Sequence, residues 1–281
     1  MEERAIPSRT LDWPVNHGGA AVVTPGGEPT WWWREGTVEG FRTPLASVTK
    51  LLTAMATLAA VERGHLDLDE PVDEQGATVR HLLAHAAGWP QEAGARRRAV
   101  GERRVYSNVG FRLLGELVAE AVGTSFEGWV AAQVTGPLGM ASTGFDPAAT
   151  AAADPAAGAA GTLPDLVRLA RCLLDHGAPV LGEELFAEAT TVQFPGLAGL
   201  VPGVGRFDPN DWGLGFELRD GKRPHWMGER RSPGSFGHFG ASGCFLWVDP
   251  EPGLAVAAVS DRDFDDGRWA MATWPAWSDR L

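Results

Sequence analysis

A serine and a lysine three positions apart, Ser47 and Lys50, are the first residues in this chain whose types and spacing could do chemistry together. Residues 47–62 contain no glycine or proline and are dense in Ala, Leu and Met, which predicts a helix. Residues three apart share a helix face, so the Ser47 hydroxyl and the Lys50 amine should point the same way. Ser47 would lie in the first turn, where unpaired N–H groups and the helix dipole favour negative charge. The pair therefore indicates an activated nucleophile, although such spacing is common by chance.

The elements that would position this pair follow an α/β pattern of the α+β type. Residues 19–23 and 30–34 flank a Pro-Gly-Gly turn and predict a hairpin. Helical periodicity marks the middle of the chain, at residues 79–86, 109–122, 126–134, 163–174 and 183–190. The C-terminal part predicts strands and then a covering helix, at residues 212–219, 240–248, 254–261 and 267–279. The Ala/Gly/Pro-rich stretch 146–161 predicts a loop.

Strands near both termini with helices between them predict one antiparallel sheet formed from both chain ends, flanked by helices, with a mostly helical domain inserted. We expect residues 1–45 and 208–281 to form the sheet domain and residues 46–207 the helical domain. The active site should lie in the cleft between the two, where ligand pockets commonly form.

Composition restricts the class of function. The 281 residues are 44% apolar, enough for a full core, yet no run reaches the length of a membrane span. The net charge of −12 argues against nucleic-acid binding. Residues 1–7 lack the apolar segment of a secretion signal, so we expect a cytoplasmic protein unless a leader has been removed. Cys172 and Cys244 lie in apolar stretches and are expected to be buried free thiols.

Two further motifs follow the Ser47-x-x-Lys50 pair. They are Tyr106-Ser107-Asn108, just before a predicted helix, and His238-Phe239-Gly240. The motifs belong to longer segments, at residues 43–72, 78–88, 106–123, 137–140 and 237–249. In this order the segments resemble the serine beta-lactamase-like hydrolases, which include class C beta-lactamases, D,D-peptidases and family VIII esterases. The resemblance extends from about residue 19 to residue 261 and implies a beta-lactamase/transpeptidase-like fold.

The resemblance implies a role for each motif residue. Ser47 would be the nucleophile, and Tyr106 with Lys50 would take up its proton. Asn108 would orient a substrate amide or the lysine. A tyrosine that acts as a base needs a pKa far below about 10, so positive charge should lie near it. His238 would polarise the Tyr106 hydroxyl or contact the substrate.

The segment after His238 would form the opposite wall of the site. Gly240 would let the substrate approach the strand closely, and the backbone N–H groups of Ala241 and Ser47 would form the oxyanion hole. Phe239 departs from the family pattern, in which a small hydroxylated residue usually stands. A phenyl group cannot hydrogen-bond to a carboxylate and makes the pocket more apolar. This disfavours beta-lactam and D,D-peptide substrates and favours a neutral ester, amide or lactone.

His81 and His85 have the i,i+4 spacing of a metal-binding pair, but no acidic residue completes a convincing site, so we expect neither a metal nor a cofactor. Trp89, Trp212 and Trp226 lie in predicted loops and could line an apolar pocket.

The favoured function is a serine hydrolase that acts through an acyl-enzyme on small carboxylic esters, or a related acyl transferase. One alternative is a beta-lactamase or D-amino-acid-specific peptidase, and another is a sensor or pseudoenzyme that binds or acylates without turnover. The expected partner is a small ester, amide or lactam, with no nucleic acid and no membrane. The sequence does not indicate an oligomeric state.

Overall fold

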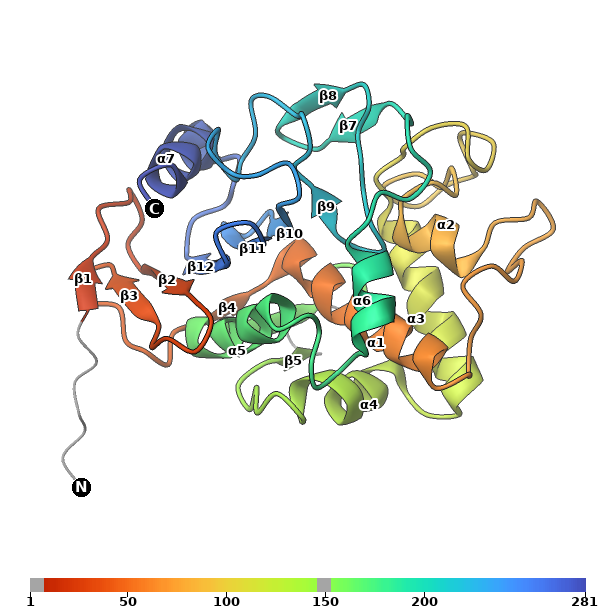
Figure 1. Ribbon diagram of the computed structural model, residues 1–281, viewed down its shortest axis with the longest axis horizontal. Coiled ribbons are helices and arrows are strands. Elements are labelled where there is room, and N and C mark those ends of the chain that lie inside the picture. Colours follow the sequence, from red (N-terminus) through yellow and green to blue (C-terminus); the bar gives the residue numbers. More distant parts are fainter. Residues whose placement is uncertain (1–7, 146–152) are drawn as a thin grey trace.

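The computed structural model describes residues 8–145 and 153–281 (Figure 1). Within these residues the main sheet has seven strands in the order β1-β3-β2-β12-β11-β10-β9. They are β1 (Ser8–Thr10), β2 (Gly18–Val23), β3 (Thr30–Trp33), β9 (Glu217–Leu218), β10 (Phe236–Gly240), β11 (Cys244–Asp249) and β12 (Leu254–Ser260). Neighbouring strands are antiparallel except β1 and β3, which are parallel. The predicted sheet from both chain ends is therefore confirmed, with one parallel edge pair added.

The two faces of the sheet pack against different helices, because successive strand residues point to opposite sides. In β12, Ala257 joins a hydrophobic cluster with α5 (Leu163–Leu174). Its neighbour Ala258 joins a second cluster, which contains the tryptophans of α7 (Trp269–Ser278). Figure 1 shows α5 and α7 on opposite sides of the strands. The helix predicted over residues 267–279 is confirmed.

The helix that carries Lys50, α1 (Thr49–Glu62), is buried along residues 49–60. An apolar helix of this kind belongs in the core, because it has no polar face to present to water. A short 3-10 turn, η1 (Ala46–Val48), precedes it. The helices and turns around it are α2 (Val79–Leu83), α3 (Asn108–Val122), α4 (Phe126–Val130), the π-helical turn η2 (Ala131–Thr135) and α6 (Glu183–Ala189). The 3-10 turn η3 (Asp266–Arg268) lies directly before α7. Two smaller sheets contain β4 (Arg42–Pro44), β5 (Gly144–Phe145) and β6 (Ala159–Thr162), and β7 (Gly199–Val201) and β8 (Gly205–Phe207).

Some predicted boundaries were wrong. The strand expected at 240–248 is the end of β10, a turn and β11, because Gly243 at φ +78° allows the chain to reverse. The strand expected at 212–219 shrinks to β9. Part of the loop expected at 146–161 pairs with β4 as β6, while residues 146–152 lie outside the described residues.

One hydrophobic cluster contains residues of α1, α3 and the main sheet. The division into residues 1–45 with 208–281 and residues 46–207 stays a prediction. Cys172 and Cys244 are buried and unbridged, as expected. Across residues 8–145 and 153–281, no helix has the length and apolar character needed to cross a bilayer.

Candidate active site

Ser47 lies on the 3-10 turn η1 rather than in the first turn of α1. The residue before it, Ala46, has φ 45°, a left-handed conformation that costs an alanine about 1 kcal/mol. The Val48 N–H donates to the Leu45 carbonyl at 3.0 Å and closes this tight turn. The serine is half-buried, so its hydroxyl is held in place yet remains accessible.

Three side chains predicted to act together do meet at Ser47. The Tyr106 hydroxyl donates to Ser47 Oγ at 2.8 Å, and Lys50 Nζ lies 3.2 Å from the same oxygen. The lysine ammonium also lies 4.9 Å from the centre of the Tyr106 ring. Ser47 Oγ is therefore flanked by two groups that can exchange protons with it.

Lys50 is fully buried and surrounded by neutral oxygens. Besides Ser47, its Nζ donates to Asn108 Oδ1 at 2.6 Å and to the Ala156 carbonyl at 2.9 Å. Burial lowers the pKa of Lys50 to about 7. The charges of Asp154 and Glu92 raise this pKa and that of Arg112 lowers it, but burial has the largest effect. Near neutral pH a large fraction of Lys50 can therefore lack its proton and serve as a base.

The pKa of Tyr106 moves in the opposite direction. Burial raises the pKa of Tyr106 well above its ordinary value, and the carboxylates of Glu217 and Glu92 add to this, while the hydrogen bond to Ser47 opposes it. A tyrosine that acts as a base needs a lowered pKa, and the pKa of Tyr106 is raised instead. The surroundings keep its hydroxyl protonated, so it is suited to donating a proton.

Tyr106 and Asn108 are positioned by the start of α3. The Ser107 side chain caps this helix by accepting from the Gly110 N–H at 2.9 Å, and its hydroxyl donates to the Pro90 carbonyl at 2.8 Å. These contacts fix the backbone between the two functional side chains, so Tyr106 and Asn108 reach Ser47 and Lys50 from one rigid helix end.

A charged network lies behind Asn108, and the sequence interpretation missed it. Asn108 Nδ2 donates to Glu92 at 2.7 Å, and Arg112 pairs with both Glu92 (3.2 Å) and Asp154 (2.9 Å). Asp154 in turn accepts from the Ala156 N–H, next to the carbonyl that holds Lys50. Only the i,i+4 spacing of Asn108 and Arg112 on a predicted helix could have indicated it.

His238 lies on β10 and faces the site as a neutral ring. Burial, with the charge of Lys50, lowers the pKa of His238 to about 4. Its Nδ1 hydrogen-bonds to the Phe239 carbonyl at 2.7 Å, whereas its buried Nε2 has no partner among the described residues. If Nδ1 carries the proton, Nε2 is an acceptor aimed at the cavity. The His238 and Tyr106 ring centres are 5.9 Å apart, and a hydrogen bond between them does not occur among the described contacts.

Gly240 has a packing role that the sequence did not indicate. A Cβ at this position would lie 2.3 Å from the Leu45 carbonyl oxygen, so only glycine lets β10 pack against η1. The turn that carries Ser47 thus approaches the strand closely, while the approach of a substrate at Gly240 stays a prediction. This packing brings Ala241 beside Ser47 at the cavity wall, while their pairing as an oxyanion hole stays a prediction.

The cavity at Ser47 has a volume of about 130 Å³. Its lining consists of Ser47, Gln91, Tyr106, Val201, Pro202, Trp212, Glu217, His238, Phe239, Ala241, Phe264 and Asp265. Phe239 borders it but packs its ring 4.5 Å from that of Phe264. Of the three loop tryptophans, Trp212 lines the cavity, Trp226 packs behind Phe239, and Trp89 instead stacks on an arginine.

Glu217, at one edge of this cavity, is a fully buried carboxylate that the sequence interpretation did not identify. His225 Nε2 lies 3.0 Å from it, Trp226 donates to it at 2.8 Å, and Lys222 lies 3.6 Å away. Burial alone would raise the pKa of Glu217, but Lys222, His225 and these hydrogen bonds outweigh burial and lower it to about 2.

His81 and His85 serve separate contacts. His81 Nδ1 lies 2.9 Å from the Thr78 hydroxyl, whereas His85 Nδ1 accepts from the Ser107 N–H at 3.1 Å. The His85 ring packs against Tyr106 with centres 4.6 Å apart. His85 therefore supports the tyrosine from behind.

Solved structures of other proteins share the fold of this chain. A structure of a beta-lactamase from Mycobacterium bovis is 44% identical, with 95% of this chain and 94% of that chain aligned at a TM-score of 0.87. A hydrolase with promiscuous acyltransferase activity, EstCE1, shares the fold at 16% identity, with 94% of each chain aligned at a TM-score of 0.74.

Curated relatives match over shorter stretches. A penicillin-binding protein of Bacillus subtilis is 29% identical in an alignment of length 132 that covers 35% of this chain and 29% of that protein. The D-alanyl-D-alanine-carboxypeptidase/endopeptidase AmpH of Escherichia coli is 27% identical in an alignment of length 140 that covers 37% of this chain and 36% of that protein. The match thus spans about a third of each relative. Residues 14–277 fit the family model for beta-lactamase, and the chain belongs to the beta-lactamase family, whose members are serine hydrolases.

Proposed function

We propose that this protein hydrolyses small carboxylic esters through an acyl-enzyme on Ser47, or passes the acyl group to another acceptor. The observation that carries the proposal is the placement of Ser47 Oγ between the Tyr106 hydroxyl, at 2.8 Å, and Lys50 Nζ, at 3.2 Å. A nucleophile between a poised base and a proton donor is the arrangement that acyl transfer requires.

Acylation begins with neutral Lys50, which the lowered pKa makes available near pH 7. Lys50 Nζ accepts the Ser47 proton as Oγ attacks the carbonyl carbon. Tyr106, which is protonated in the resting enzyme, gives its proton to the departing alkoxide when the ester C–O bond breaks, and the proton on Lys50 then replaces it. In the second half of the reaction water attacks the acyl carbon and its proton passes through Tyr106 to Lys50. Lys50 returns a proton to Ser47 Oγ as the bond between Ser47 and the acyl carbon breaks.

The developing oxyanion needs hydrogen-bond donors. The backbone N–H groups of Ser47 and Ala241 are the proposed pair, because the Gly240–Leu45 approach holds their two segments together. One such donor is typically worth about 2.7–4 kcal/mol in the transition state.

The cavity supports a small, uncharged acyl group. Its volume of about 130 Å³ is below the roughly 300 Å³ of common ligand pockets. Phe239 offers no hydroxyl, and His238 is neutral, so the described residues that line this cavity include no cation to bind a carboxylate.

The alternative, a beta-lactamase or D-amino-acid-specific peptidase, has its own support. The 44% identical neighbour is described as a beta-lactamase, and one curated relative is a D-alanyl-D-alanine carboxypeptidase/endopeptidase. The substrate test must therefore include a beta-lactam.

The test compares wild type with Ser47→Ala on p-nitrophenyl acetate, p-nitrophenyl butyrate and nitrocefin. Ser142→Ala, at an exposed serine outside the cavity, is the matched control. We expect ester turnover in wild type and in the control, and a loss of at least roughly 10³-fold in Ser47→Ala. Ester turnover that persists in Ser47→Ala would refute the assignment, and nitrocefin cleavage faster than ester cleavage would establish the alternative.

A further inference from the structure

A second cavity, of about 540 Å³, adjoins the catalytic one. Gln91, Tyr106 and Pro202 line both. The second cavity lies between the chain around residues 90–106 and the β7–β8 hairpin, which pair where the Arg104 N–H donates to the Ala198 carbonyl at 3.0 Å. Figure 1 shows this hairpin beside the yellow loop that follows α2. The two cavities are therefore neighbours that share part of their walls.

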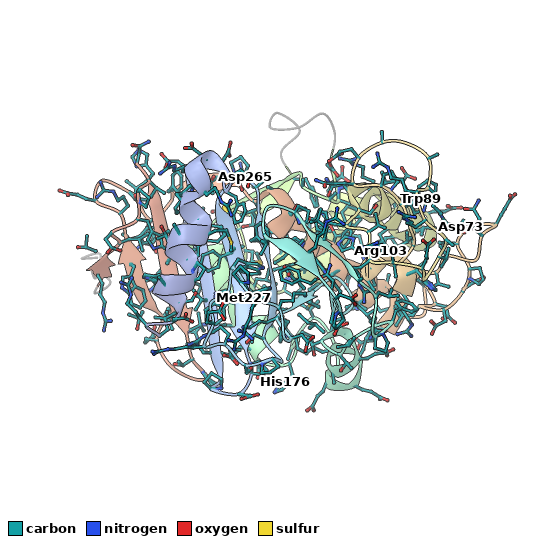
Figure 2. The ribbon with its side chains drawn as sticks, turned by 90° about the horizontal axis from the view of Figure 1, so that it is seen from above. Asp73, Trp89, Arg103, His176, Met227 and Asp265 are labelled. Atoms are coloured by element: carbon teal, nitrogen blue, oxygen red, sulfur yellow. The ribbon has the colours of Figure 1, made fainter. Side chains whose placement is uncertain are left out.

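The lining of this second cavity is strongly cationic. It holds five arginines and no carboxylate among the described lining residues: Arg97, Arg98, Arg103, Arg104 and Arg206. This concentration of positive charge stands out in a chain with a net charge of −12. Seen from above, Arg103 lies on the side of Asp73 and Trp89, whereas Asp265, at the catalytic cavity, lies on the side of α7 (Figure 2).

Two of the five arginines already have partners. Arg104 is buried and donates to backbone carbonyls, such as those of Ala84 at 2.6 Å and Gln193 at 2.7 Å. Arg98 pairs with Glu102 at 3.5 Å. The guanidinium groups of these two arginines therefore already contact other parts of the protein.

The other three arginines are different. Arg97 and Arg206 are exposed and Arg103 is half-buried. Among the ion pairs and side-chain hydrogen bonds of the described residues, none uses their guanidinium groups. Three unpartnered guanidinium groups around one cavity create a local field that attracts and binds anions.

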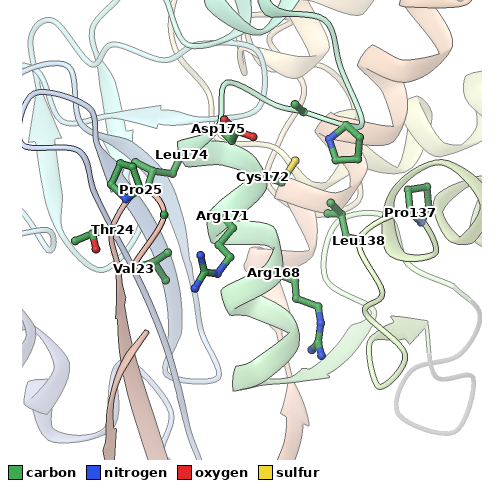
Figure 3. Close-up of a pocket in the computed structure, with 13 residues that line it drawn as sticks. Val23, Thr24, Pro25, Pro137, Leu138, Arg168, Arg171, Cys172, Leu174 and Asp175 are labelled. Carbon is green, nitrogen blue, oxygen red and sulfur yellow. The ribbon is translucent and has the colours of Figure 1, made fainter. Parts of the chain in front are cut away.

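A third cavity provides a useful contrast. It has about 440 Å³ and lies away from Ser47, with Arg168 and Arg171 projecting from α5 (Figure 3). There, Arg168 pairs with Asp165 at 2.9 Å, and Arg171 donates to the Gly27 carbonyl at 2.7 Å. Both arginines are engaged, so this cavity offers no comparable anion site.

We propose that the arginine-lined cavity binds an anionic group, a carboxylate or a phosphate, on the alcohol part of the ester. The assignment to the alcohol part rests on the proposed function, in which Tyr106 protonates the leaving group. Because Tyr106 lines both cavities, the group that departs from Ser47 passes it on the way to Arg103 and Arg206. Phe239 offers no contact to an anion in the cavity at Ser47. The arginines of the second cavity supply such a contact to the alcohol part of the ester.

The reaction balances without a co-reactant other than water. Ser47 Oγ bonds to the acyl carbon, the ester C–O bond breaks, and the anionic alcohol leaves with the proton from Tyr106. Water then releases the small carboxylic acid and restores the Ser47 hydroxyl.

The test compares 3-acetoxybenzoate with its neutral analogue 3-acetoxybenzamide, and 3-acetoxyphenyl phosphate with both. In wild type we expect a higher kcat/KM for the anionic esters by roughly tenfold, the factor for one charge-assisted hydrogen bond. The ratio of anionic to neutral ester should fall as salt rises, because partly exposed charges are screened. The two anionic esters show which anion is preferred.

The variants Arg103→Gln and Arg206→Gln should each lower that ratio severalfold. Arg206 is exposed on β8, so Arg206→Gln should fold normally. This variant therefore tests the proposal even if Arg103→Gln fails to fold. Arg280→Gln removes the same charge from an exposed position outside the cavity and should leave the ratio unchanged.

Equal kcat/KM values for charged and neutral esters in wild type would overturn the inference. So would an anionic preference that survives in both arginine variants, or a stronger preference for an anionic acyl group, measured with mono-p-nitrophenyl glutarate against p-nitrophenyl valerate. If no ester is hydrolysed, the proposed function fails, and calorimetry decides the inference separately. Ser47→Ala should bind 3-hydroxybenzoate more tightly than 3-hydroxybenzamide, and equal or absent binding would overturn the proposal.

Discussion

Lys50 and Lys222 are both buried lysines, yet their surroundings are opposite. The ammonium of Lys50 touches only neutral oxygens, and the Glu92 carboxylate near it contacts Asn108 instead. The ammonium of Lys222 lies 3.6 Å from the Glu217 carboxylate and donates to the Asp211 carbonyl at 2.7 Å.

The difference teaches how one fold makes a base and a structural cation from the same side chain. Burial lowers the pKa of both lysines, but for Lys222 the contacting Glu217 opposes it directly. For Lys50, Asn108 separates the ammonium from Glu92, and its pKa falls to about 7. Burial without a contacting carboxylate thus lets a lysine exchange protons at neutral pH.

The largest expected effect is on activity at Lys50. Lys50→Met should lower kcat by roughly 10³-fold, because Lys50 is the base that contacts Ser47 Oγ among the described residues. Lys50→Arg should be as inactive, since a guanidinium stays protonated. Lys222→Met, assayed on its folded fraction, is the matched control and should retain kcat within a few-fold. Comparable losses of kcat in Lys50→Met and Lys222→Met would contradict the view that Lys50 is a base and Lys222 a structural cation.

The second effect is on stability at Lys222. Lys222→Met leaves Glu217 buried without its cation and should lower the free energy of unfolding by about 3 kcal/mol. Lys50→Met leaves only neutral acceptors behind and should cost less. Urea unfolding followed by circular dichroism measures both. Combining Lys222→Met with Glu217→Gln should recover part of the loss, and a double variant less stable than Lys222→Met would contradict the ion pair.

The third effect is the pH dependence of stability. Between pH 10.5, the ordinary pKa of lysine, and about pH 7, the folded protein leaves Lys50 neutral while the unfolded chain protonates it. Stability contributed at this site therefore rises with pH, by up to about 1.4 kcal/mol per pH unit. The difference in unfolding free energy between wild type and Lys50→Met should move in favour of wild type across this window. A flat difference would show that Lys50 keeps its proton.

The smallest effect concerns Glu92. The ester kcat/KM should rise with pH around an apparent pKa of about 7, as Lys50 loses its proton. The Glu92 charge raises the pKa of Lys50, so Glu92→Gln should shift the midpoint down, by less than about half a unit because Glu92 is largely exposed. Glu120→Gln, an exposed change on α3, is the control. An upward shift of the midpoint would contradict the conclusion that the Glu92 charge raises the pKa of Lys50.

Local patterns in the sequence predicted much of the fold. The span of α5 was predicted without error, and α3 begins one residue earlier than expected because the Ser107 cap lies just before it. The pairing of both chain ends followed from the order of strands and helices. The reversal at Gly243 was missed although the segment Gly240-Ala241-Ser242-Gly243 consists of small residues typical of turns.

The candidate site was predicted only in part. The motifs led to Ser47, Lys50 and Tyr106, which the structure brings together, though their catalytic roles stay predictions. The direction of the Tyr106 pKa shift could not be read from the sequence, because it depends on burial in three dimensions. The Glu217 cluster was missed for the same reason, since its partners meet only when the loop after β9 folds back.

The contact between Gly240 and the Leu45 carbonyl has a practical consequence for engineering. It sets the distance between the two backbones, so the proposed oxyanion site between Ser47 and Ala241 has a fixed width. Libraries that aim to change the substrate range should therefore leave position 240 alone. Diversity belongs at residues 201–202 and 264–265, which border the cavity from separate segments and carry no such constraint on the turn of Ser47.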